Sequence, residues 1–566
     1  MKFSDTDRLS VVSAQAPQVR SAPAPEMTCG EMLVKLLEGY GVEWIFGIPG
    51  AHTIELYRGL ADARLRHVTP RHEQGAGFMA DGYARVTGKP GVCFIITGPG
   101  MTNIATAMAQ AYADSIPMLV ISSVNARHQL GNGNGHLHEL PSQRDTVAGF
   151  TAFSHTLMSP DELPDVLARA FAVFESARPR PVHIELPLDV ITAPAGHLSL
   201  ARVPMPAKPK AAANAIEQTA ERLAQARRPL LLVGGGALAA TDEVRALAAR
   251  LQAPVALTIN AKGVLPPDHP LLLGSTQSTR PTRELVREAD VVLAVGTELG
   301  ETDYDVVFDG GFAIDGTLIR IDIDRAQLTR NFPADIAIHA DAQQALHALV
   351  AALVRKDVAL PAADWGAARV VQTRHAVSQT FDAAALAHQR LIETAAATLP
   401  DVIMVGDSTQ PVYTGNVVYD AAQPRSWFNA STGYGTLGYG LPAAIGARIG
   451  APQRPVVCLI GDGGLQFTLP ELGAAVEAGV PVAVVVWNNR GYAEIKKYMV
   501  ERDITPVGVD IYTPDFVTIA RGFGCEARRI NNPAALADAL REAMTQRVPT
   551  LIEIDESQWF EEVRAC

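Results

Sequence analysis

Short apolar runs alternate with amphipathic segments along most of this chain, and the alternation recurs three times. Strands separated by helical segments are typical of parallel sheets covered by helices on both faces. The sequence therefore predicts an α/β protein with three consecutive doubly wound parallel-sheet domains. The expected strands are 44–46, 67–69, 92–97, 118–122, 229–233, 255–257, 291–295, 318–323, 402–405, 456–460, 482–487 and 551–554.

Polar, proline-containing stretches at 203–210 and 360–365 separate the three rounds and are typical of linkers. Residues 1–26 are rich in Ala, Ser, Pro and Gln and have no continuous apolar core, so we expect a disordered arm rather than a secretory signal. The expected units are the arm 1–26 and domains at 27–194, 211–355 and 380–566.

The composition excludes several classes of protein. A chain of 566 residues with 48% hydrophobic content is long enough to bury several cores. Its net charge of -12 without a basic stripe argues against nucleic-acid binding, and its apolar runs fall short of the roughly 18 residues of a membrane helix. The five cysteines lack paired or metal-type spacing, which is typical of a reducing compartment. We expect a cytoplasmic enzyme that binds neither nucleic acid nor membrane.

Two motifs follow neighbouring expected strands near the C-terminus. Residues 461–464 read Gly-Asp-Gly-Gly, and the next strand ends at Asn488 and Asn489. Because parallel strands end at one sheet edge, Asp462 and Asn489 should converge there. A carboxylate and an amide oxygen suit Mg²⁺ that retains phosphate oxygens, and the glycines let phosphates approach backbone amides. Either motif alone is more often an ordinary turn, but the combination favours a cofactor site.

The combination resembles the signature of the thiamine diphosphate enzymes, Gly-Asp-Gly followed at this spacing by Asn-Asn. The resemblance implies thiamine diphosphate and Mg²⁺ as cofactors, with Asp462, Asn489 and the carbonyl of Gly491 as metal ligands. Segments 46–50 (FGIPG), 97–100 (TGPG) and 435–440 (GTLGYG) resemble acetolactate synthase and its 2-oxo acid decarboxylase relatives.

This resemblance covers nearly the whole chain after residue 27, and it implies pyrimidine-binding, central and diphosphate-binding domains in that order. Leu437 falls where the family places a bulky apolar residue under the bent cofactor, although plain core packing would also explain a leucine. The cofactor-binding residues implied are Pro49, Gly50, Asp407, Ser408, Thr409, Gly435, Leu437, Gly461, Gly463, Gly464 and Tyr492.

Glu73 lies where an expected strand gives way to a helix. In isolation it could be a helix N-terminal acid favoured by the dipole. The resemblance implies instead the catalytic glutamate that hydrogen-bonds N1′ of the cofactor's aminopyrimidine and so assists removal of the thiazolium C2 proton. In this family the glutamate of one subunit meets the cofactor held by another. The resemblance therefore implies a homodimer or homotetramer with active sites at the subunit interface.

The segments expected to contact substrate depart from the acetolactate synthase pattern. Residues 299–302 read Leu-Gly-Glu-Thr where that family has Phe-Asp-Asp-Arg, so the arginine that meets the second substrate's carboxylate is missing. Tyr498 replaces the tryptophan that favours a larger acceptor, and residues 137–139 read Leu-His-Glu in place of Phe-Gln-Glu. These departures argue against acetohydroxyacid formation.

Acidic residues mark the same region: Glu301, Asp303 and Asp305 form a run, and Glu494 follows the metal loop. A carboxylate near the pocket would select a cationic tail, although charge runs are often only solvated surface. Segments 131–145 and 296–305 look most similar to the 2-ketoarginine decarboxylases of arginine catabolism.

Our first hypothesis is therefore decarboxylation of 5-guanidino-2-oxopentanoate to 4-guanidinobutanal and carbon dioxide. The alternative is a carboligase of acetolactate synthase type that condenses pyruvate. A third is a cofactor-binding regulatory paralogue, against which the intact Glu73, Asp462 and Asn489 argue.

Some residues keep two interpretations. His138 and Glu494 join Glu73 as candidate catalytic residues, as proton donors or substrate contacts. His52 and His72 could lie near the pocket, but a histidine in a strand-end loop is as often a structural hydrogen-bonding group. In the central domain, residues 234–236 (Gly-Gly-Gly) suggest a dinucleotide-binding turn without the full fingerprint. FAD or an adenine nucleotide could bind there, in a structural rather than a redox role.

Overall fold

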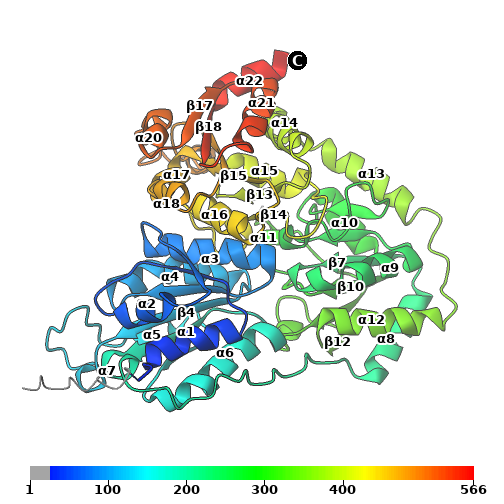
Figure 1. Cartoon of the computed structure of the whole chain (residues 1–566). Coiled ribbons are helices and arrows are strands. Elements are labelled where there is room, and N and C mark those ends of the chain that lie inside the picture. Colours follow the sequence, from blue (N-terminus) through cyan, green and yellow to red (C-terminus); the bar gives the residue numbers. More distant parts are fainter. Residues whose placement is uncertain (1–25, 307, 566) are drawn as a thin grey trace, which may run out of the picture.

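Three six-stranded, all-parallel sheets follow one another along the chain, each flanked by helices (Figure 1). The computed structural model describes residues 26–306 and 308–565. The fold class predicted from the sequence is confirmed. All but the last residue of the arm expected at 1–26 lies outside the described part. We call the units built on the three sheets the first, central and third domains.

The first sheet has the order β2-β1-β3-β4-β6-β5. Alternate strand residues enter two different cores, with Ile45 and Phe94 on one face and Phe46 and Cys93 on the other, which is why both faces need helices. Its strands are β1 (Trp44–Gly47), β2 (Arg66–Val68), β3 (Gly91–Ile95), β4 (Met118–Val124), β5 (Phe153–Thr156) and β6 (Val182–Pro187). Its helices are α1 (Cys29–Gly39), α2 (Ile54–Leu60), α3 (Glu73–Thr87), α4 (Pro99–Ala113), α5 (Gln143–Ala148), α6 (Leu163–Ser176) and α7 (Leu188–Ile191).

The central sheet has the order β12-β11-β10-β7-β8-β9. Leu231 and Leu293 pack into one core and Leu230 and Val292 into another, so this sheet is also covered on both faces. Its strands are β7 (Pro229–Val233), β8 (Val255–Leu257), β9 (Leu272–Gly274), β10 (Val291–Val295), β11 (Thr317–Asp322) and β12 (Ile336–His339). Its α-helices are α8 (Ala213–Gln225), α9 (Thr241–Leu251), α10 (Arg280–Glu288), α11 (Glu301–Tyr304), α12 (Ala342–Val354) and α13 (Ala367–Ser378), with the short 3-10 helices η3 (Gly235–Ala240) and η4 (Ile259–Ala261).

The third sheet has the order β14-β13-β15-β16-β18-β17, and its domain lies across the other two in Figure 1. Its strands are β13 (Ile403–Gly406), β14 (Trp427–Asn429), β15 (Val456–Gly461), β16 (Ala483–Asn488), β17 (Glu526–Ile530) and β18 (Thr550–Asp555). Its α-helices are α14 (Ala383–Thr398), α15 (Gln410–Val418), α16 (Gly440–Gly450), α17 (Asp462–Thr468), α18 (Glu471–Glu477), α19 (Ala493–Glu501), α20 (Phe516–Gly522), α21 (Pro533–Ala543) and α22 (Glu556–Ala565), with the 3-10 helix η6 (Ala430–Thr432) before α16.

Each of the twelve expected strands coincides with a strand of the structure, but six further strands were missed. Five of these, β5, β9, β12, β14 and β17, are edge strands, whose sequences carry weaker apolar runs because they have one neighbour. The sixth, β6, is central but includes the buried polar residues His183 and Glu185, which interrupt its apolar pattern.

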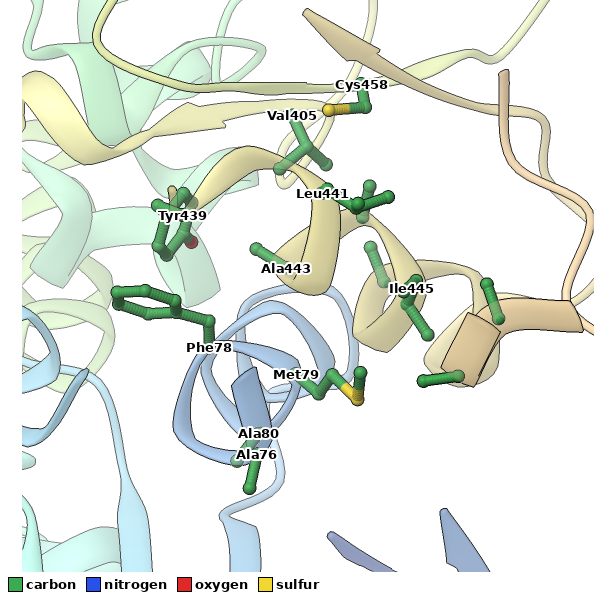
Figure 2. Packing of buried hydrophobic residues seen from close by; sticks show 14 of the residues in the cluster. Ala76, Phe78, Met79, Ala80, Val405, Tyr439, Leu441, Ala443, Ile445 and Cys458 are labelled. Atoms are coloured by element: carbon green, nitrogen blue, oxygen red, sulfur yellow. The ribbon is translucent and has the colours of Figure 1, made fainter. Parts of the chain in front are cut away.

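Helices α3 and α16 join the first domain to the third at close range. Figure 2 shows α16 lying across α3, with Tyr439 above Phe78 and Ile445 beside Met79. A Cβ atom added to Gly82 would collide with the carbonyl oxygen of Ala443. The two helix backbones therefore approach as closely as glycine alone permits.

The expected linkers differ in structure. Residues 203–210 form no helix or strand, whereas the stretch at 360–365 packs onto the central domain through Trp365, whose buried indole N–H donates to Pro229 O. Helix α13, which follows, packs against α10 and β9 of the same domain. Within the described residues, no helix is both long enough and apolar enough to span a membrane.

Candidate active site

The candidate cofactor residues of the third domain gather where its strand order reverses. β13 lies between β14 and β15. The chain runs from β13 to β14 on one side and then crosses to β15 on the other, which opens a crevice between the loops after β13 and β15. Ser408 and Thr409 follow β13, and Asp462 follows β15. A Cβ atom on Gly461 would lie 3.0 Å from Thr409 Oγ1, so the two loops are adjacent.

Asp407 shapes this crevice from beneath. Its buried carboxylate accepts the N–H groups of Ser408 (2.9 Å), Gly438 (3.3 Å) and Gly440 (2.8 Å). Burial raises its pKa to about 6. A Cβ atom on Gly464 would lie 2.7 Å from Asp407 Oδ1, so glycine is required there. Asp407 thus fixes the loop before α16 against the turn after β13.

Three oxygen-bearing groups meet beside the crevice. One of the two terminal atoms of the Asn489 amide lies 2.9 Å from Gly491 O and 3.3 Å from Asp462 Oδ1, and the orientation of the amide decides whether this atom is the oxygen or the nitrogen. With the amide oxygen there, the Asn489 NH₂ group donates to Gln410 Oε1 (3.3 Å) and Glu556 Oε2 (3.4 Å). The reversed amide would instead turn its oxygen toward Gln410 Oε1.

The first orientation therefore leaves three acceptor oxygens, from Asp462, Asn489 and Gly491, turned toward one another without a hydrogen between them. Such a set suits a hard divalent cation. Thr513 donates to the other oxygen of Asp462 at 3.1 Å, and burial raises the pKa of this carboxyl.

Sequence reasoning missed the partners of these groups. Gln410 joins Asn489 to Glu494, because its NH₂ group donates to Glu494 Oε2 at 3.1 Å. Glu556 accepts from the indole N–H of Trp487 at 2.7 Å as well as from Asn489. Gln410 directly follows residues 407–409, which were predicted to bind the cofactor, and this position was the only indication of its role in the sequence. Nothing in the sequence pointed to Glu556.

The remaining third-domain candidates line the same loops. A Cβ atom on Gly463 would lie 2.7 Å from the ring of Tyr492, so this tyrosine packs over the Gly-Asp-Gly turn. Gly435 has φ +77°, a left-handed conformation that favours glycine. Leu437 is half-buried and lies outside the buried cores, which argues against the alternative of plain core packing.

Candidates of the first domain gather at the carboxyl edge of its sheet. Glu73 is the first residue of α3, and its Oε2 accepts from the amide of Asn103 on α4 at 2.9 Å. A Cβ atom on Gly100 would lie 3.5 Å from Glu73 Oε1. Asn103 is a further residue that sequence reasoning missed. His72 is the N-cap of α3, since its Nδ1 accepts the N–H of Gln74 at 3.1 Å, which fits its structural interpretation.

The loop after β4 brings His138 to this edge. Its ring lies edge-on to His52, with ring centroids 5.2 Å apart, and a Cβ atom on Gly98 would lie 2.5 Å from His138 O. Burial, and then His138, lower the pKa of His52. Pro49 and Gly50 lie just before His52, with Pro49 exposed.

No hydrogen bond between described residues joins the first-domain candidates to the third-domain candidates. Glu73 is bonded to Asn103 of its own domain, whereas Asp462 and Asn489 are bonded to third-domain residues. Among the described residues, no hydrogen bond joins Glu73 to Asp462 or Asn489.

The acidic run of the central domain divides into two kinds of residue. Asp305 is paired with Arg283 (2.6 Å), and Asp303 accepts the N–H of Ile259 (2.9 Å). Burial raises the pKa of Asp303 to about 7. Glu301 is exposed and forms no ion pair in the described part of the chain, and the hydroxyl of its neighbour Thr302 donates to Thr432 O at 2.9 Å. Asp303 and Asp305 thus fit structural roles, and Glu301 remains the candidate of this run for a contact with substrate.

The glycine turn of the central domain packs against the end of β10. A Cβ atom on Gly234 would collide with Gly296 O, and Gly236 N–H donates to the same oxygen at 3.0 Å. Asp324, beyond β11, is paired with Arg178 of the first domain at 3.3 Å. Packing alone thus accounts for these glycines, and nucleotide binding stays a hypothesis.

Three family models match this chain, and all describe thiamine pyrophosphate enzymes. The N-terminal TPP binding domain matches residues 27–148, the central domain 216–349 and the C-terminal TPP binding domain 407–554. The probable 2-ketoarginine decarboxylase AruI of Pseudomonas aeruginosa is 49% identical over 94% of each chain. Acetolactate synthase isozyme 1 large subunit of Escherichia coli is 33% identical over 93% of each chain. A probable acetolactate synthase large subunit of Methanocaldococcus jannaschii is 32% identical over 93% of this chain and 92% of its own.

Proposed function

The chain belongs to the thiamine pyrophosphate enzyme family, and on that premise we propose that it decarboxylates 5-guanidino-2-oxopentanoate to 4-guanidinobutanal and carbon dioxide. The observation that carries the substrate choice is the exposed carboxylate of Glu301, which has no ion-pair partner among the described residues. It lies on α11, and Thr302 of this helix donates to Thr432 O before α16. The similarity to a probable 2-ketoarginine decarboxylase supports the same substrate.

Asp462, Asn489 and the carbonyl of Gly491 are the proposed ligands of Mg²⁺. Their mutually facing oxygens fit a small cation, and Gln410 and Glu556 hold the Asn489 amide in the orientation required. The backbone N–H groups of the adjacent 461–464 turn, at the start of α17, are the proposed contacts of the diphosphate oxygens. When bound, thiamine diphosphate supplies the electron sink that 2-oxo acid decarboxylation requires.

Glu73 is the proposed partner of the cofactor's pyrimidine N1′. The Asn103 amide donates to one carboxylate oxygen, which orients the side chain and leaves the other oxygen for this contact. Because Glu73 and Asp462 share no hydrogen-bonded group in the part of the chain that the structure describes, we propose a homodimer or homotetramer in which Glu73 of one subunit serves the cofactor of another.

His138 and Glu494 are the proposed proton donors or substrate contacts. Gln410 is hydrogen-bonded both to Glu494 and to the proposed metal ligand Asn489, so Glu494 lies close to the proposed metal site. His138 lies against the Gly98 turn on the edge of the first sheet that carries Glu73. The cationic tail of the substrate would be recognised by Glu301, because a carboxylate can accept two parallel hydrogen bonds from a guanidinium group.

The second candidate function is an acetolactate synthase-type carboligase, which the similarity to acetolactate synthases over 93% of the chain favours. A decarboxylation assay with thiamine diphosphate and Mg²⁺ separates the two. We expect 2-ketoarginine to be strongly preferred over pyruvate, with aldehyde as product. Preference for pyruvate with formation of acetolactate would overturn the proposal. A visible absorbance spectrum of the purified protein would test the hypothesis of a bound flavin.

A further inference from the structure

A buried ion network lies where the three domains meet. The guanidinium of Arg85 on α3 donates through Nε to Asp81 (2.6 Å), through Nη2 to Asp114 (2.5 Å) and through Nη1 to Asn260 of the central domain (3.0 Å). The side chains of Arg85, Asp81 and Asp114 are at most 5% exposed. One side chain thus links α3, the end of α4 and the turn after β8.

The third domain is attached to this network at both ends of one loop, residues 432–439, which we call the 432–439 loop. At its start, the Thr432 hydroxyl lies 2.8 Å from both oxygens of Asp114. At its end, the Tyr439 hydroxyl donates to Asp81 at 2.5 Å, and its ring packs on Phe78 of α3 with centroids 5.3 Å apart (Figure 2). Both anchors are carboxylates of the first domain.

Toward its end the loop is also held inside the third domain, since Gly438 N–H donates to Asp407 and Gly438 O accepts from Thr468, whereas residues 433–435 have few contacts. Gly433, Tyr434 and Gly435 are exposed, and a Cβ atom on Gly435 would meet nothing within 4 Å. The N–H of Gly435 donates to Ala430 O in the 3-10 helix η6, just before the loop. The position of residues 433–435 therefore depends on how Thr432 is held before them and on how residues 436–438 are held after them.

Stability alone is a weak reason for such a network. Removing two carboxylates and a guanidinium from water costs about as much as their mutual attraction returns, and apolar residues of similar volume often serve equally well. A buried charge cluster joined by several directional hydrogen bonds does restrict its partners to one geometry. This geometry includes Asp114, which also accepts from Gln110 at 2.9 Å and so has three different donors.

We infer that Asp114 and Thr432 are positioning residues that hold the 432–439 loop in the conformation that binds the cofactor. The inference rests on the proposed assignment of Gly435 and Leu437 to the cofactor pocket. The same threonine accepts the Thr302 hydroxyl at its carbonyl oxygen, so it also fixes α11 and Glu301 relative to that loop.

Calorimetric titration of the full-length protein with thiamine diphosphate in excess Mg²⁺ tests this inference without any turnover. Thr432→Val removes the hydroxyl but keeps the shape, and we expect the dissociation constant to rise by about tenfold or more, as for loss of a hydrogen bond to a charged group. Thr432→Ser restores the hydroxyl and should bind the cofactor within about twofold of the wild-type protein.

Thr276→Val is the matched control. Its buried hydroxyl is hydrogen-bonded to Thr282 (2.8 Å) and to Leu273 O (3.1 Å) within the central domain, so this variant also loses a buried threonine hydroxyl. We expect it to lower the unfolding temperature but to leave cofactor affinity unchanged. If Thr276→Val and Thr432→Val weakened cofactor binding equally, general destabilisation would explain the loss of affinity, and the inference would be overturned.

Asp114→Asn is a second variant that nearly keeps the volume and retains one acceptor oxygen. It should also weaken cofactor binding, and its combination with Thr432→Val should cost less than the two single effects added, because both remove one interaction. Unchanged affinity in Thr432→Val and Asp114→Asn would overturn the positioning role. Absence of cofactor binding by the wild-type protein would instead overturn the proposed function.

Discussion

Asp305 is neutralised by Arg283, whose Nη2 lies 2.6 Å from the aspartate Oδ1, whereas Glu301, four positions earlier, is exposed and unpaired in the described part of the chain. The two acids belong to one sequence run, yet only the glutamate has a charge available to a ligand. This difference gives the substrate proposal a sharp test.

Glu301→Gln keeps the size of the side chain and removes its charge. We expect KM for 2-ketoarginine to rise about tenfold, because a charge-assisted hydrogen bond is lost, while turnover of an uncharged 2-oxo acid stays the same. Steady-state kinetics on both substrates is the measurement, with Glu284→Gln on the surface of the same domain as control. An equal rise of KM for both substrates would contradict charge recognition.

Glu73→Gln should lower kcat about 100-fold or more, as expected for loss of a catalytic acid or base, while leaving thiamine diphosphate binding intact. Glu55→Gln is the control, since Glu55 is likewise an acid in the first turn of a first-domain helix. If both variants lost only a little stability and kept full activity, Glu73 would be an ordinary helix N-terminal acid.

Asp462→Ala should abolish Mg²⁺-dependent binding of thiamine diphosphate, because one of three converging oxygen ligands is lost. Chelation of divalent ions should have the same effect on the wild-type protein and be reversed by added Mg²⁺. Titration calorimetry with and without Mg²⁺ gives the readout, with Asp510→Ala, an exposed acid of the same domain, as control. Metal-independent binding in the wild-type protein would refute this ligand set.

Gly82→Ala should destabilise the contact between α3 and α16, because the new methyl group would collide with Ala443 O. Overpacking of this kind costs about 1–3 kcal/mol, and backbone gives way less readily than a side chain. Gly149→Ala is the matched control: its φ is -68°, and a Cβ atom there meets nothing within 4 Å. Thermal unfolding should show a lower midpoint for Gly82→Ala alone.

His183 should lower the free energy of unfolding in mild acid. It is fully buried between Ser122 (2.8 Å) and Ser154 (2.7 Å), and burial lowers its pKa from 6.5 to about 3. Below about pH 6.5 the histidine is therefore protonated in the unfolded state but stays neutral in the folded state. Its contribution to stability is complete above pH 6.5 and is lost as the pH falls from there toward 3. The free energy of unfolding, measured with denaturant, should fall more steeply between pH 7 and pH 5 for the wild-type protein than for His183→Gln.

The exposed His375 supplies the control for this measurement, because His375→Gln should leave the pH dependence as it is in the wild-type protein. Parallel curves for His183→Gln and the wild-type protein would mean that His183 is protonated in the folded state.

The sequence by itself determined the three α/β domains, twelve of the strands and the family. These features are local, since each depends on the order of apolar residues within one segment or on motifs such as the Gly-Asp-Gly turn. The same reasoning placed Asp462 and Asn489 at one sheet edge, because parallel topology alone brings strand ends together.

Only the tertiary structure decided which polar side chains pair. Asp114 and Thr432 are 318 positions apart, and Asp305 meets an arginine 22 positions before it. The amide partners of Glu73 and Asn489 are similarly remote, 30 and 79 positions away. Such contacts depend on how whole helices and sheets pack, and a sequence pattern with a period of two or 3.6 residues carries no information about that packing. The pattern of one segment thus determines its own strand or helix, while the charge that a site presents to its ligand is decided by the rest of the molecule.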